Sequence, residues 1–121
     1  KRRPKPGLAK AMNVIGEVKD KIAIILDDMA DTAGTLAEAS GAVDKNGAIE
    51  VHAAVTHPVL SGEALRKIND SPLKSLVYCK TIRVSEKVVT NEKTKGLSIA
   101  PLFGEAIVRS FRGDSVTSLF E

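Results

Sequence analysis

A short acidic segment followed by small hydroxylated residues carries the most recognisable chemistry in this sequence. It reads Asp-Asp-Met-Ala-Asp-Thr-Ala-Gly-Thr and covers residues 27–35. Its first two residues supply carboxylates, which can accept hydrogen bonds from sugar hydroxyls or hold Mg²⁺ through water. Backbone N–H groups at the beginning of a helix bind phosphate, and a glycine lets such groups converge. The segment therefore predicts a site for a sugar phosphate, with the phosphate at residues 31–35.

The residues that we expect to contact the sugar phosphate run along this whole segment. They are Asp27, Asp28, Asp31, Thr32, Ala33, Gly34 and Thr35. The ordinary alternative is a solvated acidic turn between a strand and a helix, with Thr35 as a simple helix cap. We favour the binding site because the acidic pair, the glycine and the hydroxyls occur together in one short loop.

The beginning of the chain could also do chemistry, because all of its charges are positive. Arg can bind a phosphate through two parallel hydrogen bonds, whereas Lys acts as a point charge. The alternatives are a solvated terminus and an arm that binds nucleic acid, although residues 1–10 contain no aromatic side chain for base stacking. A small polyphosphate partner explains the charge equally well, since the rest of the chain is nearly neutral. The basic residues of this arm are Lys1, Arg2, Arg3, Lys5 and Lys10.

The elements that must position these residues alternate between strand and helix patterns. We predict strands at 12–15, 21–26, 49–55, 76–78 and 97–99, and helices at 35–46, 63–69 and 102–111. This alternation is typical of an α/β fold with a mainly parallel sheet flanked by helices. The nearly continuous apolar run at 21–26 predicts a strand that is buried on both faces. Because ligands bind at the carboxyl ends of such strands, the loops at 27–35 and 56–62 are expected to face the site.

Length and composition indicate one domain with an aliphatic core. Hydrophobic residues make up 43% of the 121 residues and aromatic residues only 3%, so Ile, Val, Leu and Ala must form the core. No apolar run approaches the roughly 20 residues of a membrane helix. The single cysteine, Cys79, excludes an internal disulfide and favours a reducing, cytoplasmic location. The first residue is Lys, which we interpret as a sign that an upstream portion is missing.

The acidic segment resembles the phosphoribosyl-diphosphate (PRPP) binding motif of PRPP synthases. Type I phosphoribosyltransferases share a related acidic-pair loop, but Asp31 before Thr32 is more similar to the synthases. Residues 1–4 resemble the start of the flexible catalytic loop of that family. Further segments that resemble the family, in the family's order, are 56–62, 101–102, 105–107 and 115–120. Lys80 and Arg83 depart from it, because they stand where the family often has a small or acidic residue and a proline.

The resemblance implies an enzyme that transfers the diphosphoryl group of ATP to the anomeric hydroxyl of ribose 5-phosphate, using Mg²⁺. It implies catalytic roles for Lys1 and Arg3, and ribose 5-phosphate contacts for Arg3 as well as for the acidic segment. It assigns residues 1–121 to the C-terminal, ribose-5-phosphate-binding domain of type I phosphoribosyltransferase-like fold, with 1–10 as a flexible arm and an N-terminal half absent. No metal ligand is assigned within this chain.

The resemblance also implies an assembly and an effector site. The family forms homo-hexamers, and its bacterial-type members bind phosphate or ADP at a subunit interface near the segment that matches Ser115 and Thr117. The alternative for these two residues is a polar C-terminal turn. Neither a nucleic acid nor a membrane is expected as a partner.

Three other functions remain open at the level of sequence. A type I phosphoribosyltransferase would explain the acidic segment but not residues 1–4. A non-catalytic regulatory subunit of a PRPP synthase would keep the fold but alter the catalytic loops. A nucleic-acid-binding module would use the basic arm and would show strongly salt-dependent binding.

Overall fold

The computed structural model describes residues 14–120, which form an α/β domain with a four-stranded parallel sheet in the order β1-β2-β3-β4. This architecture confirms the predicted α/β fold with a mainly parallel sheet flanked by helices. The elements are β1 (Ile22–Ala30), α1 (Gly34–Lys45), β2 (Glu50–Pro58), α2 (Ala64–Asp70), β3 (Leu73–Cys79), α3 (Glu86–Val89), β4 (Thr94–Leu97), α4 (Ala100–Arg112) and the 3₁₀ helix η1 (Thr117–Leu119).

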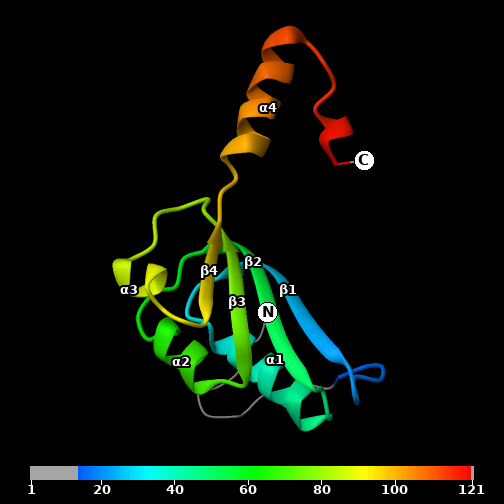
Figure 1. The fold of residues 1–121 in the computed structure, drawn as a ribbon, viewed down its shortest axis with the longest axis vertical. Coiled ribbons are helices and arrows are strands. Elements are labelled where there is room, and N and C mark those ends of the chain that lie inside the picture. Colours follow the sequence, from blue (N-terminus) through cyan, green and yellow to red (C-terminus); the bar gives the residue numbers. More distant parts are fainter. Residues whose placement is uncertain (1–13, 121) are drawn as a thin grey trace, which may run out of the picture.

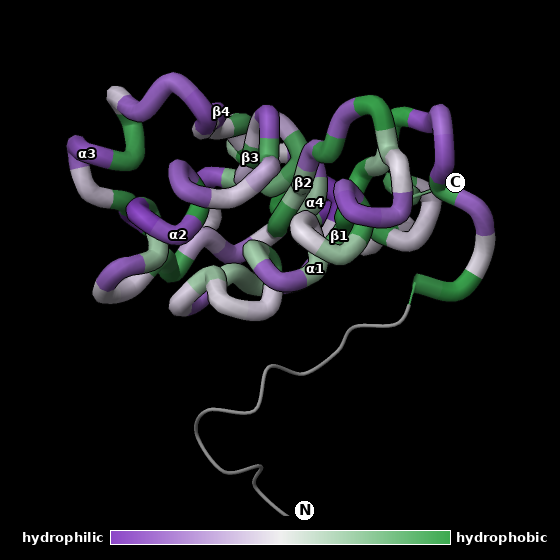
Figure 2. The backbone as a smooth tube through the Cα atoms, turned by 90° about the horizontal axis from the view of Figure 1, so that it is seen from below, coloured by the Kyte–Doolittle hydropathy of each residue, from purple (hydrophilic) through white to green (hydrophobic). Residues whose placement is uncertain are grey.

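The core lies between one face of the sheet and the helices α1, α2 and α3. Figures 1 and 2 show α1 and α2 on the same side of the strands. Alternate residues of β2 point into this layer, as the period of two along a strand requires. The largest fully buried side chains there are Ile68, Leu73, Leu76 and Val51. As expected from the composition, the core is almost entirely aliphatic, with Tyr78 as its aromatic member.

The opposite face of the sheet is exposed, which contradicts the prediction of a strand buried on both faces. Ile22, Ile24 and Leu26 of β1 are 62%, 66% and 77% exposed. They alternate with residues that face the helices, so they share the uncovered face. The apolar run correctly indicated a strand, but the layer that would cover its second face does not occur among residues 14–120.

The strands at the site are longer than their sequence pattern predicts. β1 continues through Asp27 and Asp28 to Ala30, although the acids suggested that a turn begins at Asp27. The parallel register aligns Asp27 with Val55 and Ala30 with Pro58, so ladder hydrogen bonds extend both strands. Pairing with a neighbour therefore outweighs the low strand propensity of aspartate.

The region between β3 and α4 differs most from the predictions. Residues 83–95, for which no element was expected, contain α3, and Val88 anchors this helix in the core. The strand predicted at 97–99 lies earlier, at Thr94–Leu97, because β4 aligns Gly96 with Tyr78 of β3. Residues 14 and 15 are not in a strand, and the rest of the strand predicted at 12–15 lies outside the described residues.

The helix ends follow the sequence closely. Asn46 is the C-cap of α1, and Gly47 follows it with a φ of 90°, where glycine avoids the strain of a side chain. Pro101 lies in the first turn of α4, as predicted. Helix α4 projects away from the sheet, and none of its residues is buried (Figure 1). Between residues 14 and 120, no helix combines the length and the apolar character that a membrane span requires.

Candidate functional site

Most of the predicted sugar-phosphate residues meet in one cavity at the carboxyl end of β1. This cavity has a volume of about 180 Å³. Asp27 lines it from the strand, and residues 31–35 line it from the turn that leads into α1. We call residues 31–35 the phosphate cradle. The cavity is therefore lined by the carboxylates of Asp27 and Asp31 and by the N-terminus of α1, which are the groups predicted to contact a sugar phosphate.

Asp28 is the predicted residue that does not line this cavity. Since both acids lie within β1, their side chains leave the strand on opposite sides. The backbone N–H of Asp28 donates a hydrogen bond to Oδ1 of Asp27 at 2.9 Å, and the Asp28 side chain is exposed. The two carboxylates therefore do not act as a single pair facing one cavity.

The cradle owes its shape to a residue in an uncommon backbone conformation. Ala33, the N-cap of α1, is in the left-handed region with φ 55° and ψ 14°. A residue with a side chain adopts this conformation only where its surroundings impose it, and such residues cluster at functional sites. Ala33 is also 5% exposed, so packing holds it in place.

The first turn of α1 leaves its N–H groups available to a ligand. No side chain caps the helix, and its first turn contains no acid. Thr35 thus lies within the helix and lines the cavity, rather than starting the helix as predicted. The first N–H groups of a helix have no partner within the helix, and together with the helix dipole they attract an anion.

The loop after β2 supports the cradle, as expected from the parallel sheet. The Ser61 hydroxyl donates to Oδ1 of Asp31 at 2.5 Å, and the Ser61 N–H donates to the Asp31 carbonyl at 3.0 Å. The N–H of Leu60 donates to the Ala30 carbonyl at 2.9 Å. These bonds fix Asp31 from a loop that is 30 residues away in sequence.

Lys67 of α2 is a cation at the cradle that the sequence did not indicate. Its Nζ donates to the Thr32 carbonyl at 3.1 Å and lies 3.9 Å from the position that a Cβ of Gly34 would occupy. This charge adds to the positive end of α1 and favours an anion there. Nothing in the spacing along the chain connects Lys67 with Thr32, because the contact depends on how α2 packs beside α1.

The remaining predicted residues are not part of this cavity. Lys1 and Arg3 lie outside the described residues. Ser115 and Thr117 lie beyond α4, which carries them away from the cradle (Figure 1). Arg109 donates to the Ser115 carbonyl at 3.1 Å, so a cation is present in this C-terminal segment.

Two clear pKa shifts of carboxyl groups lie outside the cradle. The Arg66 guanidinium, at 2.5 Å, lowers the pKa of Glu63 through a hydrogen bond and its charge. Lys74 and then His52 lower the pKa of Glu50 by hydrogen bonding at the start of β2. Within residues 14–120, no group of three or more His, Cys, Asp or Glu side chains could hold a metal ion.

The chain is similar to known proteins over its whole length. The profile of the phosphoribosyl synthetase-associated domain family matches residues 3–121. The ribose-phosphate pyrophosphokinase of Halalkalibacterium halodurans is 49% identical over 121 residues, which is all of this chain and 38% of the relative. That of Bacillus subtilis is 48% identical over 120 residues, which is 99% of this chain and 38% of the relative.

A solved structure agrees with these relatives in fold. The crystal structure of phosphoribosylpyrophosphate synthetase from Mycobacterium smegmatis matches with a TM-score of 0.77 and 34% sequence identity. The match covers 82% of this chain and 33% of that protein. The chain thus spans somewhat more than a third of the length of the curated relatives, at 38%.

Proposed function

Because this chain belongs to the phosphoribosyl synthetase-associated domain family, we propose that it is the ribose-5-phosphate-binding part of a ribose-phosphate diphosphokinase. The whole enzyme transfers the diphosphoryl group of ATP to the C1 hydroxyl of ribose 5-phosphate and yields PRPP and AMP. We propose that the enzyme is cytoplasmic. On its own, the 121-residue chain binds the sugar phosphate weakly and does not turn over.

The observation that carries this proposal is the cavity between Asp27 and the phosphate cradle. The uncapped N-terminus of α1 supplies N–H groups for the 5-phosphate, and Lys67 adds a positive charge behind it. Asp27, which lines the same cavity, accepts hydrogen bonds from ribose hydroxyls. A cavity of about 180 Å³ is suited to a small sugar phosphate but not to a whole nucleotide.

In this proposal Lys1 and Arg3 contact the diphosphoryl group during transfer. Phosphoryl transfer concentrates negative charge, and fixed cations stabilise it more in the transition state than in the ground state. Mg²⁺ is held mainly by substrate phosphates and waters with one or two carboxylates. Asp27 is the carboxylate at the cavity that fits such a site, with Asp28 next to it on the strand. The metal would neutralise phosphate charge.

We further propose that this chain is the C-terminal half of a longer subunit and that the subunits assemble into a homo-hexamer. Two exposed apolar surfaces support this proposal, because a further part of the protein would cover them. One is the open sheet face with Ile22, Ile24 and Leu26, and the other is α4, where Phe103 and Phe111 are 58% and 93% exposed. Apolar area of this extent normally marks a surface that another part of a protein covers. We place the effector at Ser115 and Thr117, next to Arg109.

The test is PRPP formation by the protein at its full length, from ATP, Mg²⁺ and ribose 5-phosphate. Lys1→Ala is expected to lower the rate at least about 100-fold, while ribose 5-phosphate affinity changes little. Lys5→Ala is the matched control on the same arm and is expected to keep most of the rate. A folded protein that binds ribose 5-phosphate but forms no PRPP would instead support a regulatory subunit or a phosphoribosyltransferase.

A further inference from the structure

Three successive carbonyl groups in the turn after β1 accept hydrogen bonds from one side. Their donors are the backbone N–H groups of Leu60 and Ser61 and Nζ of Lys67, which bond in that order to the carbonyls of Ala30, Asp31 and Thr32 at 2.9, 3.0 and 3.1 Å. All three donors lie between the end of β2 and the end of α2, and none of their residues lines the cavity of the phosphate cradle. One unit of the chain, residues 60–67, therefore holds this side of the turn.

These bonds also decide where the N–H groups of the same turn point. In a planar trans peptide, the carbonyl of one residue and the N–H of the next point in opposite directions. Because the carbonyls face residues 60–67, the N–H groups of Asp31, Thr32 and Ala33 point the other way, and all three residues line the cavity. Among residues 14–120, none of these three N–H groups donates to another backbone or side-chain atom. The turn therefore presents three free donors on the side of the cavity.

The backbone of Ala33 continues this arrangement into α1. Ala33 is left-handed, and Gly34, the next residue, is the first of the right-handed helix. Neighbouring residues of opposite hand turn successive N–H groups toward a common point, which forms a nest for an anion. The N–H groups of Gly34 and Thr35, which have no partner within the helix, extend this nest.

The carboxylate of Asp31 is an unexpected group beside such a nest, because it repels a phosphate. The Ser61 hydroxyl donates to its Oδ1 at 2.5 Å, so the carboxylate is tied to the loop after β2. Leu60, the residue before Ser61, has a φ of 46°, which lies in the left-handed region and costs energy for a residue with a side chain. Its surroundings therefore impose the shape of the loop that holds Asp31.

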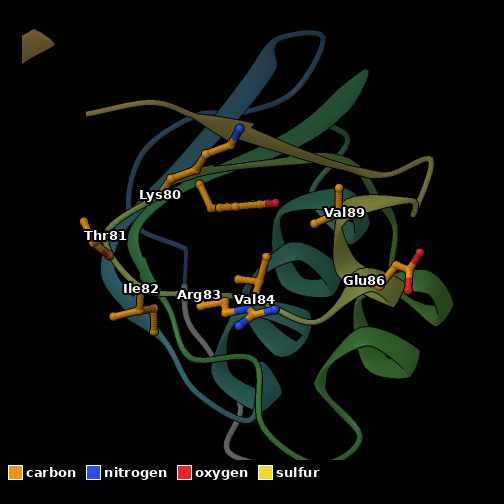
Figure 3. A pocket seen from close by; sticks show the side chains of 8 residues that line it. Lys80, Thr81, Ile82, Arg83, Val84, Glu86 and Val89 are labelled. Atoms are coloured by element: carbon orange, nitrogen blue, oxygen red, sulfur yellow. The ribbon is translucent and has the colours of Figure 1, made fainter. Parts of the chain in front are cut away.

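The loop after β3 does not take part in this support. Figure 3 shows Thr81 and Ile82 on one side of a second cavity, and Glu86 and Val89 of α3 on the other. This cavity has a volume of about 680 Å³ and shares no lining residue with the cavity of the cradle. The support of the cradle thus comes from the unit after β2 rather than from every loop at this edge of the sheet.

We propose that Ser61 is a positioning residue for the phosphate cradle, and that Asp31 is its acceptor rather than a contact of the ligand. Ser61 holds the Asp31 carboxylate away from the phosphate and keeps the N–H groups of the turn directed into the cavity. This inference rests on the proposed binding of ribose 5-phosphate at the cradle. It gives Asp31, which the sequence indicated as a ligand contact, a supporting role.

The test is isothermal titration calorimetry with ribose 5-phosphate on the protein at its full length. Ser61→Ala is expected to bind about fivefold more weakly, because the freed carboxylate can turn toward the phosphate. Ser61→Thr keeps the hydroxyl and should stay within about twofold of the unaltered protein. Asp31→Asn keeps an oxygen acceptor without the charge, so it should bind as tightly or more tightly. A carboxylate that contacted the ribose or its metal ion would instead make Asp31→Asn at least about tenfold weaker.

The double variant Ser61→Ala/Asp31→Ala shows whether Ser61 acts through Asp31. It should bind no more weakly than Asp31→Ala alone, because the hydroxyl has no partner once the carboxylate is absent. Ser85→Ala is the matched control, since Ser85 does not cap α3 with its side chain and lines neither cavity. Urea unfolding of each variant separates a loss of binding from a loss of the fold. Should Ser61→Ala fail to fold, Asp31→Asn decides the question.

Four results with ribose 5-phosphate would overturn the inference. Ser61→Ala keeps full affinity, Ser61→Thr does not restore it, Asp31→Asn binds at least about tenfold more weakly, or the two alanine effects add in the double variant. If the unaltered protein does not bind ribose 5-phosphate, the proposed function fails. The same variants would then be titrated with inorganic phosphate, for which we expect the same order of affinities. A different order, or no binding of inorganic phosphate, overturns the inference in its own right.

Discussion

The substitution Gly34→Ala should separate ligand binding from folding at the phosphate cradle. Gly34 is the first residue of α1 and lines the cavity. A Cβ built there would lie 3.8 Å from Oγ1 of Thr32 and 3.9 Å from Nζ of Lys67, which are ordinary contact distances. The folded protein can therefore accept the methyl group, but the group takes up space where a phosphate approaches the backbone.

The substitution is expected to keep or raise the stability of the fold and to lower the affinity for ribose 5-phosphate. Alanine restricts the unfolded chain and suits a helix, so stability should stay the same or rise by up to about 1 kcal/mol. Loss of one charged hydrogen bond from the helix N-terminus to the phosphate costs about 1.5–3 kcal/mol. Ribose 5-phosphate affinity should therefore fall about 10- to 150-fold.

The matched control is Gly41→Ala, in the same helix. A Cβ on Gly41 would meet nothing within 4 Å, and Gly41 does not line the cavity. Both variants would be made in the protein at its full length and compared by urea unfolding and by isothermal titration calorimetry with ribose 5-phosphate. If Gly34→Ala binds as tightly as Gly41→Ala, the cradle does not hold the phosphate. If Gly34→Ala unfolds more easily instead, the glycine serves the fold rather than the ligand.

Three further predictions concern neighbouring features. Gly96→Ala should destabilise the protein by about 1–3 kcal/mol, because its Cβ would lie 2.8 Å from the buried Tyr78 ring; an unchanged urea midpoint would contradict this. Lys67→Met should weaken ribose 5-phosphate binding up to about fivefold and make it less sensitive to salt, as calorimetry at two salt concentrations can measure. Lys74 and His52 lower the pKa of Glu50 in the folded protein. This carboxylate therefore stabilises the folded protein at a pH above its unfolded pKa of about 4.3, and the stabilisation is lost as the pH falls through its lower folded pKa. The difference in unfolding free energy between the protein and Glu50→Gln should therefore shrink as the pH falls from about 6 to about 3, and a constant difference would refute the ion-pair explanation.

The sequence by itself determined most of the succession of elements, with α3 as the helix that it missed, and it determined the place of the sugar-phosphate loop. The apolar run at 21–26, the small residues of 35–46 and the Asn46-Gly47 pair are local signals, and each was sufficient for a strand, a helix or a helix end. The acidic segment could be recognised because its residues are contiguous. A strand that runs into a helix brings the end of the strand and the following turn to one edge of the sheet, although the side chain of Asp28 does not line the cavity there.

Only the tertiary structure decided which side chains complete each cavity. Strand pairing extended β1 through Asp27 and Asp28 and so separated the two acids. The packing of α2 beside α1 brought Lys67 to the cradle, and the register of β4 set Gly96 against Tyr78. These contacts join residues that are distant in the chain. Their positions follow from backbone hydrogen bonding and core packing between elements, which no local pattern of residue types encodes.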